Sequence, residues 1–188
     1  MTNEEQKELT QQRLSNALLH LMSFEPLNKI SVTKLTREAN VSRWAFYRNF
    51  NYIDEILIKY STKLFHDFYQ GNIINQSPIN WEQFSLYIYR FIRKNGFFIQ
   101  ELYENEKSEI WFNAAVNESE KFFQKKLGHP VPKEKLLFLT GGIMALAYEW
   151  VKKDARQNIN ELAIIINPQL QVILNDDKNK PGGSLFDK

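Results

Sequence analysis

The chain has 188 residues, no cysteine and a net charge of only +2, with 43% hydrophobic and 24% charged residues. This length suits one large domain or two small ones with a real core, and the lack of cysteine excludes disulfides and thiol chemistry. No run of about 18 apolar residues exists, and the polar start MTNEEQKELTQQ is unlike a secretory signal, so we expect a cytoplasmic protein without a membrane span.

The first predicted element is an amphipathic helix over about residues 3–23. One face carries apolar residues at the spacing i, i+3, i+4 and i+7, namely Leu14, Ala17, Leu18 and Leu21. Pro26 cannot continue an interior helical turn, so the helix should end before it.

Two short helices joined by a turn are predicted next. The Ser31 hydroxyl can cap a helix over residues 32–39, and Ser42 can cap another over residues 43–49. Asn40 lies between them, and asparagine tolerates the left-handed conformation that closes a helix. This is the helix-turn-helix pattern.

The rest of the chain also reads as helical, and no segment has the pattern of a strand. A long helix of about 18 residues ends at Gly71 and is followed by a loop over residues 72–80. Further helices are predicted over residues 81–94, 97–103, 108–127, 133–153 and 160–174, the last one broken or ended early at Pro168. Residues 176–188 are polar and expected to fray.

Positive charge is concentrated in one segment. Residues 29–50 hold five cations and one acid, whereas residues 1–25 hold four acids and two cations. Cations on helices are often only solvated surface, but a basic face confined to one small segment is also typical of a phosphate-binding surface.

The third helix has two different faces. Helical spacing places Phe46 and Phe50 together, toward the core, and a second set on the other side: Arg43, Trp44, Tyr47 and Arg48. A recognition helix needs such a split, because arginine can bind guanine through two hydrogen bonds and a tyrosine hydroxyl can reach a phosphate. A rotated helix that buries Trp44 is the alternative.

Several spaced features of residues 10–58 resemble the TetR family of bacterial transcriptional regulators. They are Ser31-Val32, Leu35-Thr36, Ala39-Asn40-Val41-Ser42, Phe46-Tyr47-Arg48-Asn49-Phe50 and Asp54-Glu55-Ile56-Leu57. The chain departs from the family pattern at Trp44-Ala45, which makes the recognition surface bulky, and at Ile53, where the family commonly has a phosphate-binding lysine. Phosphate contact would then shift to other residues: Lys29, Lys34, Tyr47 or Arg48.

The resemblance implies an all-α protein of about nine helices. Residues 1–52 would form a three-helix, helix-turn-helix DNA-binding domain, and residues 53–175 a larger ligand-binding and dimerisation domain. The third helix would lie in the major groove of a palindromic operator bound by a homodimer. The implied DNA-binding residues are Ser31, Thr33, Lys34, Ser42, Arg43, Trp44, Ala45, Tyr47, Arg48 and Asn49. Release from DNA by an unknown small-molecule effector is the default expectation.

The C-terminal half offers weaker signals. The stretch around Gly141, Gly142, Ala145 and Trp150 resembles the dimerising end of the family, although the glycines would equally suit close packing inside one subunit. An aromatic-rich core could hold an effector, and the residues whose polar groups could orient it are Tyr87, Trp111 and Tyr148.

Other classes of function find less support. No nucleophile, metal-ligand spacing or phosphate-binding glycine loop is present, so we expect no enzyme, no metal and no cofactor. A helical assembly protein would not need a basic second and third helix. Because the family lysine is absent, a coactivator with the same fold that binds a protein partner and only weakly binds DNA remains an alternative.

Overall fold

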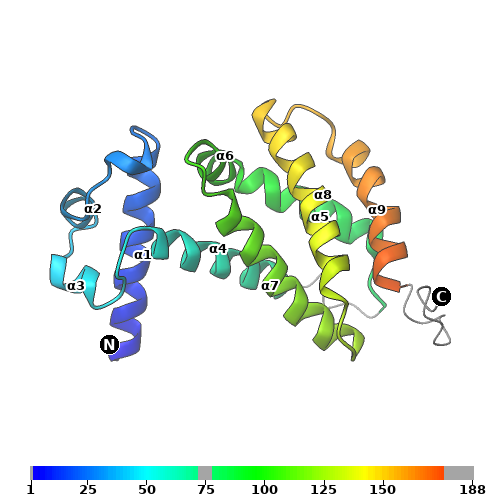
Figure 1. Cartoon of the computed structure of the whole chain (residues 1–188), viewed down its shortest axis with the longest axis horizontal. Helices are drawn as coiled ribbons and strands as arrows, with labels where there is room; N and C mark the ends of the chain where they lie inside the picture. Colours follow the sequence, from blue (N-terminus) through cyan, green and yellow to red (C-terminus); the bar gives the residue numbers. More distant parts are fainter. Residues whose placement is uncertain (1, 72–77, 176–188) are drawn as a thin grey trace, which may run out of the picture. The chain divides into compact units, whose positions relative to one another are not determined.

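The computed structural model describes residues 2–71 and 78–175. In these residues the chain forms nine α-helices, one 3₁₀ turn and no strand, which confirms the predicted all-α class (Figure 1). The elements are α1 (Asn3–Met22), η1 (Leu27–Lys29), α2 (Val32–Glu38), α3 (Arg43–Tyr47), α4 (Asp54–Tyr69), α5 (Trp81–Lys94), α6 (Gly96–Glu104), α7 (Ser108–Leu127), α8 (Lys133–Lys152) and α9 (Ile159–Asn175). None of these helices is long and apolar enough to cross a membrane.

The contacts divide the chain into two compact units. Unit 1 comprises residues 2–67 and 97–115, and unit 2 comprises the described residues among 68–96 and 116–175. Unit 1 therefore combines the N-terminal helices with α6 and the first part of α7. The division after residue 52 and the frayed tail at residues 176–188 stay predictions, and the tail lies outside the described residues.

The caps explain where the first helices begin. Thr2 accepts a hydrogen bond from the Glu5 N–H, and the Glu5 carboxylate accepts one from the Thr2 N–H, which forms a complete capping box. The Ser31 and Ser42 hydroxyls accept the N–H groups of Lys34 and Ala45 at 3.2 and 3.0 Å. Both predicted serine caps are thus confirmed.

Unit 1 has a core built on the apolar face of α1. Leu14 and Leu18 are fully buried, together with Leu35 of α2 and Phe46 of α3. A second cluster in the same unit joins Trp111 of α7 to Phe65, with ring centroids 4.5 Å apart, and to Phe98, at 5.8 Å. The helix-turn-helix segment packs on α1 through the first of these two clusters.

Unit 2 is built around α5, which packs against α8 and α9 (Figure 1). Tyr89 of α5 meets Trp150 of α8 edge to face, with centroids 5.4 Å apart. Phe68 forms a further aromatic cluster with Phe84, Tyr87 and Phe91.

The predicted break at Pro168 does not occur. The helix α9 runs without interruption from Ile159 to Asn175 with the proline inside it. Proline removes one backbone hydrogen bond, but apolar residues on both sides of it are buried: Leu162, Ile166, Leu170 and Leu174. Burial of this continuous apolar face outweighs the local cost at Pro168.

Candidate nucleic-acid interface

The turn between α2 and α3 is tightly fixed. Asn40 has a φ of 51°, the left-handed conformation that the sequence predicted for it. The Val41 N–H donates to the Thr36 carbonyl at 3.0 Å, and the Asn40 N–H donates to the Arg37 carbonyl at 3.2 Å. The turn therefore sets the angle at which α3 leaves α2.

The two faces of α3 are divided as predicted. Phe46 and Phe50 are buried, and their ring centroids lie 6.1 Å apart. Trp44 is 67% exposed, so the alternative of a rotated helix that buries it is wrong. Arg43, Tyr47 and Arg48 are also exposed. The outer face of α3 thus presents two arginines and two aromatic side chains to solvent.

The exposed side chains of α3 are partly ordered by one another. The Arg48 guanidinium carbon lies 4.5 Å from the centroid of the Trp44 ring, a cation–π contact. This contact limits the conformations of both long side chains and keeps the positive charge next to the exposed indole.

Other predicted DNA-binding residues have structural roles. Asn49 donates to the Ala45 carbonyl at 2.7 Å and accepts a hydrogen bond from the Gln11 amide at 3.0 Å, which ties α3 to α1. The Lys34 ammonium pairs with the Glu25 carboxylate, which balances its charge. Ser31, Thr33 and Ser42 are exposed, whereas Ala45 is half-buried.

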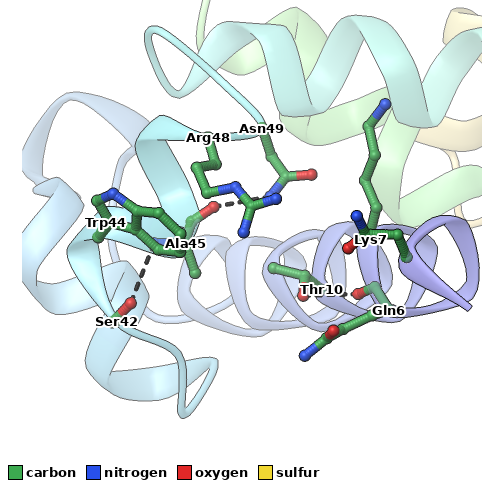
Figure 2. Close-up of a pocket in the computed structure, with 9 residues that line it drawn as sticks. Gln6, Lys7, Thr10, Ser42, Trp44, Ala45, Arg48 and Asn49 are labelled. Carbon is green, nitrogen blue, oxygen red and sulfur yellow. Dashed lines mark hydrogen bonds between the residues drawn. The ribbon is translucent and has the colours of Figure 1, made fainter. Parts of the chain in front are cut away.

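A groove separates α1 from α3. We call it the α1–α3 groove: it has a volume of about 170 Å³ and is lined by Asn3, Gln6, Lys7, Thr10, Ser42, Trp44, Ala45, Arg48 and Asn49. Figure 2 shows Gln6, Lys7 and Thr10 on α1 facing Ser42, Trp44, Arg48 and Asn49 across this groove. Most of these lining side chains are hydrogen-bond donors.

The start of α4 is acidic, and the half-buried Ile53 lies just before it. The Glu55 carboxylate accepts hydrogen bonds from the Asn51 side-chain amide at 2.9 Å and the Asn51 backbone N–H at 2.6 Å, which lowers the pKa of Glu55. Asp54 pairs with Lys107 at 2.6 Å, and this contact raises the pKa of Lys107. A phosphate placed here would meet carboxylates.

The residues predicted to orient an effector lie in both units. Tyr87 and Tyr148 belong to unit 2, where Tyr87 stacks on Phe68 with centroids 4.7 Å apart and its hydroxyl lies 3.4 Å from the Phe68 carbonyl. The Lys152 ammonium lies 5.9 Å from the Tyr148 ring centroid. Trp111 belongs to unit 1 and is buried in its core. Their role in effector binding stays a prediction.

Tyr89 is a buried polar residue that is not among the residues predicted from the sequence. This side chain is fully buried in unit 2, its hydroxyl has no hydrogen-bond partner among residues 2–71 and 78–175, and burial raises its pKa to about 12. A signal was available, because Tyr89 lies one helical turn after the buried Ser85, on the apolar side of α5.

The four residues predicted for dimerisation differ from one another in solvent exposure. Gly142 and Ala145 are exposed on α8, and Gly141 is half-buried. A Cβ added to Gly142 would meet no atom within 4 Å, so packing inside the subunit does not require this glycine. The predicted role of Trp150 in dimerisation is corrected by the structure. Its side chain is buried against Tyr89 and donates its indole N–H to the Gln157 carbonyl at 3.2 Å. Its side chain is therefore not available to a partner subunit.

Further exposed apolar side chains lie on α8 and α9. Phe138 of α8 is 70% exposed and Ile164 of α9 is 71% exposed, and Val172 is also exposed.

In the part of the chain that the structure describes, no group of three histidine or carboxylate side chains lies close enough together to hold a metal ion.

This arrangement, a helix-turn-helix followed by further helices, is the fold of TetR-type transcriptional regulators. Three solved structures share it over most of the chain. The first is the dihydroxyacetone kinase operon activator DhaS, which is 20% identical and has a TM-score of 0.59; the match covers 87% of this chain and 96% of that one.

The second is the fatty acid degradation regulator FadR from Bacillus halodurans, 15% identical with a TM-score of 0.55, over 91% of this chain and 97% of that one. The third is a TetR transcriptional regulator from Rhodococcus sp. RHA1, 12% identical with a TM-score of 0.52, over 92% of this chain and 98% of that one. No family model and no curated protein matches the chain. Because all three sequence identities are low, the structural similarity shows a shared fold and does not by itself assign a function.

Proposed function

We propose that this chain is a TetR-type transcriptional regulator that binds a palindromic operator as a homodimer through α3. The observation that carries the proposal is the division of α3: Phe46 and Phe50 fix it to the core, while Arg43 and Trp44 are exposed at its start. The first residues of a recognition helix are those that reach base edges in the major groove.

The chemistry of the outer face suits DNA. Arg43 has no partner among the interactions described above, and a guanidinium can donate two hydrogen bonds to guanine. The Trp44 ring can contact a thymine methyl group, and the Tyr47 hydroxyl can donate to a phosphate. Two copies of α3 related by a two-fold axis would read half-sites roughly 34–36 Å apart, or a multiple of this distance.

The exposed apolar surface of α8 and α9 supports the homodimer. Phe138, Gly142 and Ala145 of α8 and Ile164 and Val172 of α9 are exposed in the single chain. A two-fold interface brings the same patch of both subunits together, so one apolar surface is sufficient. A glycine with free space around it would permit close approach of the partner helix.

An effector would act by binding the DNA-incompetent conformation more tightly, and it could shift the population only by its differential affinity. We propose release of a repressor as the default. The similarity to an operon activator makes activation the second candidate, in the form of a coactivator with a protein partner. The acidic start of α4 beside Ile53, which cannot bind phosphate, favours this second candidate.

The test is binding of the purified protein to duplexes from beside its own gene and to duplexes selected from a random pool. Arg43→Ala should weaken binding to the selected duplex by roughly 1–3 kcal/mol and relax specificity at one base pair. Arg13→Ala is the matched control, because Arg13 is an exposed arginine of α1 that does not line the α1–α3 groove.

Two results would contradict the proposal. If Arg43→Ala keeps the affinity and specificity of the unmodified protein, α3 does not read bases through Arg43. If the protein binds no duplex in a salt-dependent manner and co-purifies with a protein partner, the coactivator is the better interpretation.

A further inference from the structure

The face of α1 that turns toward α3 changes character along the helix. At 3.6 residues per turn, one face contains Asn3, Lys7, Thr10, Leu14, Ala17 and Leu21. Leu14, Ala17 and Leu21 are buried in the core of unit 1, whereas the residues of the first two turns are polar. A helix that only covered the core would continue its apolar face, so the polar turns indicate a different contact.

The polar turns of α1 form one wall of the α1–α3 groove. Gln6, Lys7 and Thr10 lie on this wall, and Arg48 lies on the opposite one, held over the Trp44 ring (Figure 2). The hydrogen bond from Gln11 of α1 to Asn49, which lines the groove, joins α1 to the residues that follow α3. The groove therefore has a fixed base and a rim that carries two cations.

The groove would bind an anion through side chains rather than through the free end of α1. The capping box already engages the N–H groups of Thr2 and Glu5 at this end of the helix. Lys7 and Arg48 supply the charge, and Gln6 supplies a neutral amide donor.

The acids of α1 leave this charge largely unopposed. Glu4 lies 3.9 Å from Lys7, but both side chains are exposed, and such pairs are weak and easily exchanged for a stronger anion. Glu5 and Glu8 do not line the groove, and helical spacing places them on the other side of α1.

Lys34, one of the phosphate contacts that the sequence suggested, is less suitable than Lys7 or Arg48. Lys34 is paired with Glu25, and Ile53, which precedes the acidic start of α4, stands where the TetR pattern has a lysine. If α3 lies in the major groove, Lys7 and Arg48 at the rim of the α1–α3 groove are further cations of this unit that could meet the DNA backbone.

We propose that the α1–α3 groove binds one backbone phosphate of the DNA, with Lys7 and Gln6 of α1 and Arg48 of α3 as its donors. This inference rests on the proposed function, because it requires α3 to lie along a duplex. It assigns Arg48 to the backbone rather than to a base, and it makes α1 part of the DNA interface.

The test compares Lys7→Gln with Lys59→Gln, which removes an exposed cation of α4 that does not line the groove. Binding to a selected duplex and to a random-sequence duplex is measured by fluorescence anisotropy at several salt concentrations. Lys7→Gln should weaken binding to both duplexes by about three- to tenfold and reduce the slope of log K against log salt by about 0.9. Lys59→Gln should keep both values.

A second measurement locates the contact on the DNA. Single phosphates of the selected duplex are replaced one at a time by neutral methylphosphonates. One replacement should weaken binding of the unmodified protein and of Lys59→Gln, but should have no further effect on Lys7→Gln or Arg48→Gln.

The outcomes separate the two proposals. If the unmodified protein and Lys59→Gln bind DNA and Lys7→Gln binds with the same affinity and salt slope, the groove is not a phosphate site and the proposed function stands. If the unmodified protein shows no salt-dependent binding to either duplex, both proposals are overturned. Lys7 is exposed, so its replacement should leave the thermal unfolding curve unchanged. Equal unfolding curves for all variants are the control that they are folded.

Discussion

Trp44 is the residue that most distinguishes this recognition helix. A tryptophan that is 67% exposed leaves a large apolar ring in water, and no contact with the core explains its position. Its contact with Arg48 at 4.5 Å gives it a role within α3, because it restricts a long cationic side chain beside the α1–α3 groove. Its free face remains available to a base edge.

Tyr89 is a second informative residue, and it gives a prediction for stability. Within the described part of the chain its buried hydroxyl lacks a hydrogen-bond partner, and an unsatisfied buried donor costs about 1–3 kcal/mol. Tyr89→Phe keeps the edge-to-face contact with Trp150, so we expect the free energy of unfolding to rise by about 1 kcal/mol. Urea unfolding followed by circular dichroism measures it.

The same residue predicts a dependence on alkaline pH. Because burial raises the pKa of Tyr89 from 10.0 to about 12, its neutral form is favoured in the folded state. This contribution is fully present below pH 10 and is lost as the pH rises toward 12, so Tyr89→Phe should lose less stability over this range. A variant that is less stable than the original protein at neutral pH would show that the hydroxyl has a partner.

At the scale of elements, the turn between α2 and α3 decides how α3 is presented. Asn40 holds a φ of 51°, which a β-branched side chain resists. Asn40→Val should therefore destabilise the protein by about 1–2 kcal/mol, whereas Asn40→Gly should change stability by less.

Thermal unfolding of the two Asn40 variants, with DNA binding measured on the folded protein, provides the check. Equal stabilities for Asn40→Val and Asn40→Gly would mean that the turn accepts another backbone conformation. In that case the orientation of α3 would not depend on this residue.

At the scale of the whole molecule, the exposed apolar surface of α8 and α9 predicts the oligomeric state. Phe138→Glu places a charge in the proposed two-fold interface, where it would be desolvated without a partner. We expect this variant to sediment as a monomer, with unchanged helicity and weaker binding to a palindromic duplex. Phe24→Glu is the control, because Phe24 is 75% exposed in unit 1.

Analytical ultracentrifugation measures the oligomeric state of both variants. A Phe138→Glu protein that stays dimeric would exclude this part of α8 from the interface. Dissociation of Phe24→Glu would place the interface elsewhere.

The sequence by itself determined the helical class, the two serine caps, the left-handed Asn40 and the two faces of α3. These features depend on side chains within four residues of one another, so spacing along the chain is sufficient to derive them. The same local rules led to an error at Pro168, because they include the cost of the proline but not the burial of the apolar face of α9.

Only the tertiary structure decided which local features became a site. It pairs Lys34 with Glu25, ties Asn49 to Gln11, buries Trp150 against Tyr89 and opens the α1–α3 groove beside Lys7. Each of these results joins residues from different helices, and their distances depend on how the helices pack. A sequence pattern specifies the faces of a helix, whereas the partner of each face is set by the packing of the whole core.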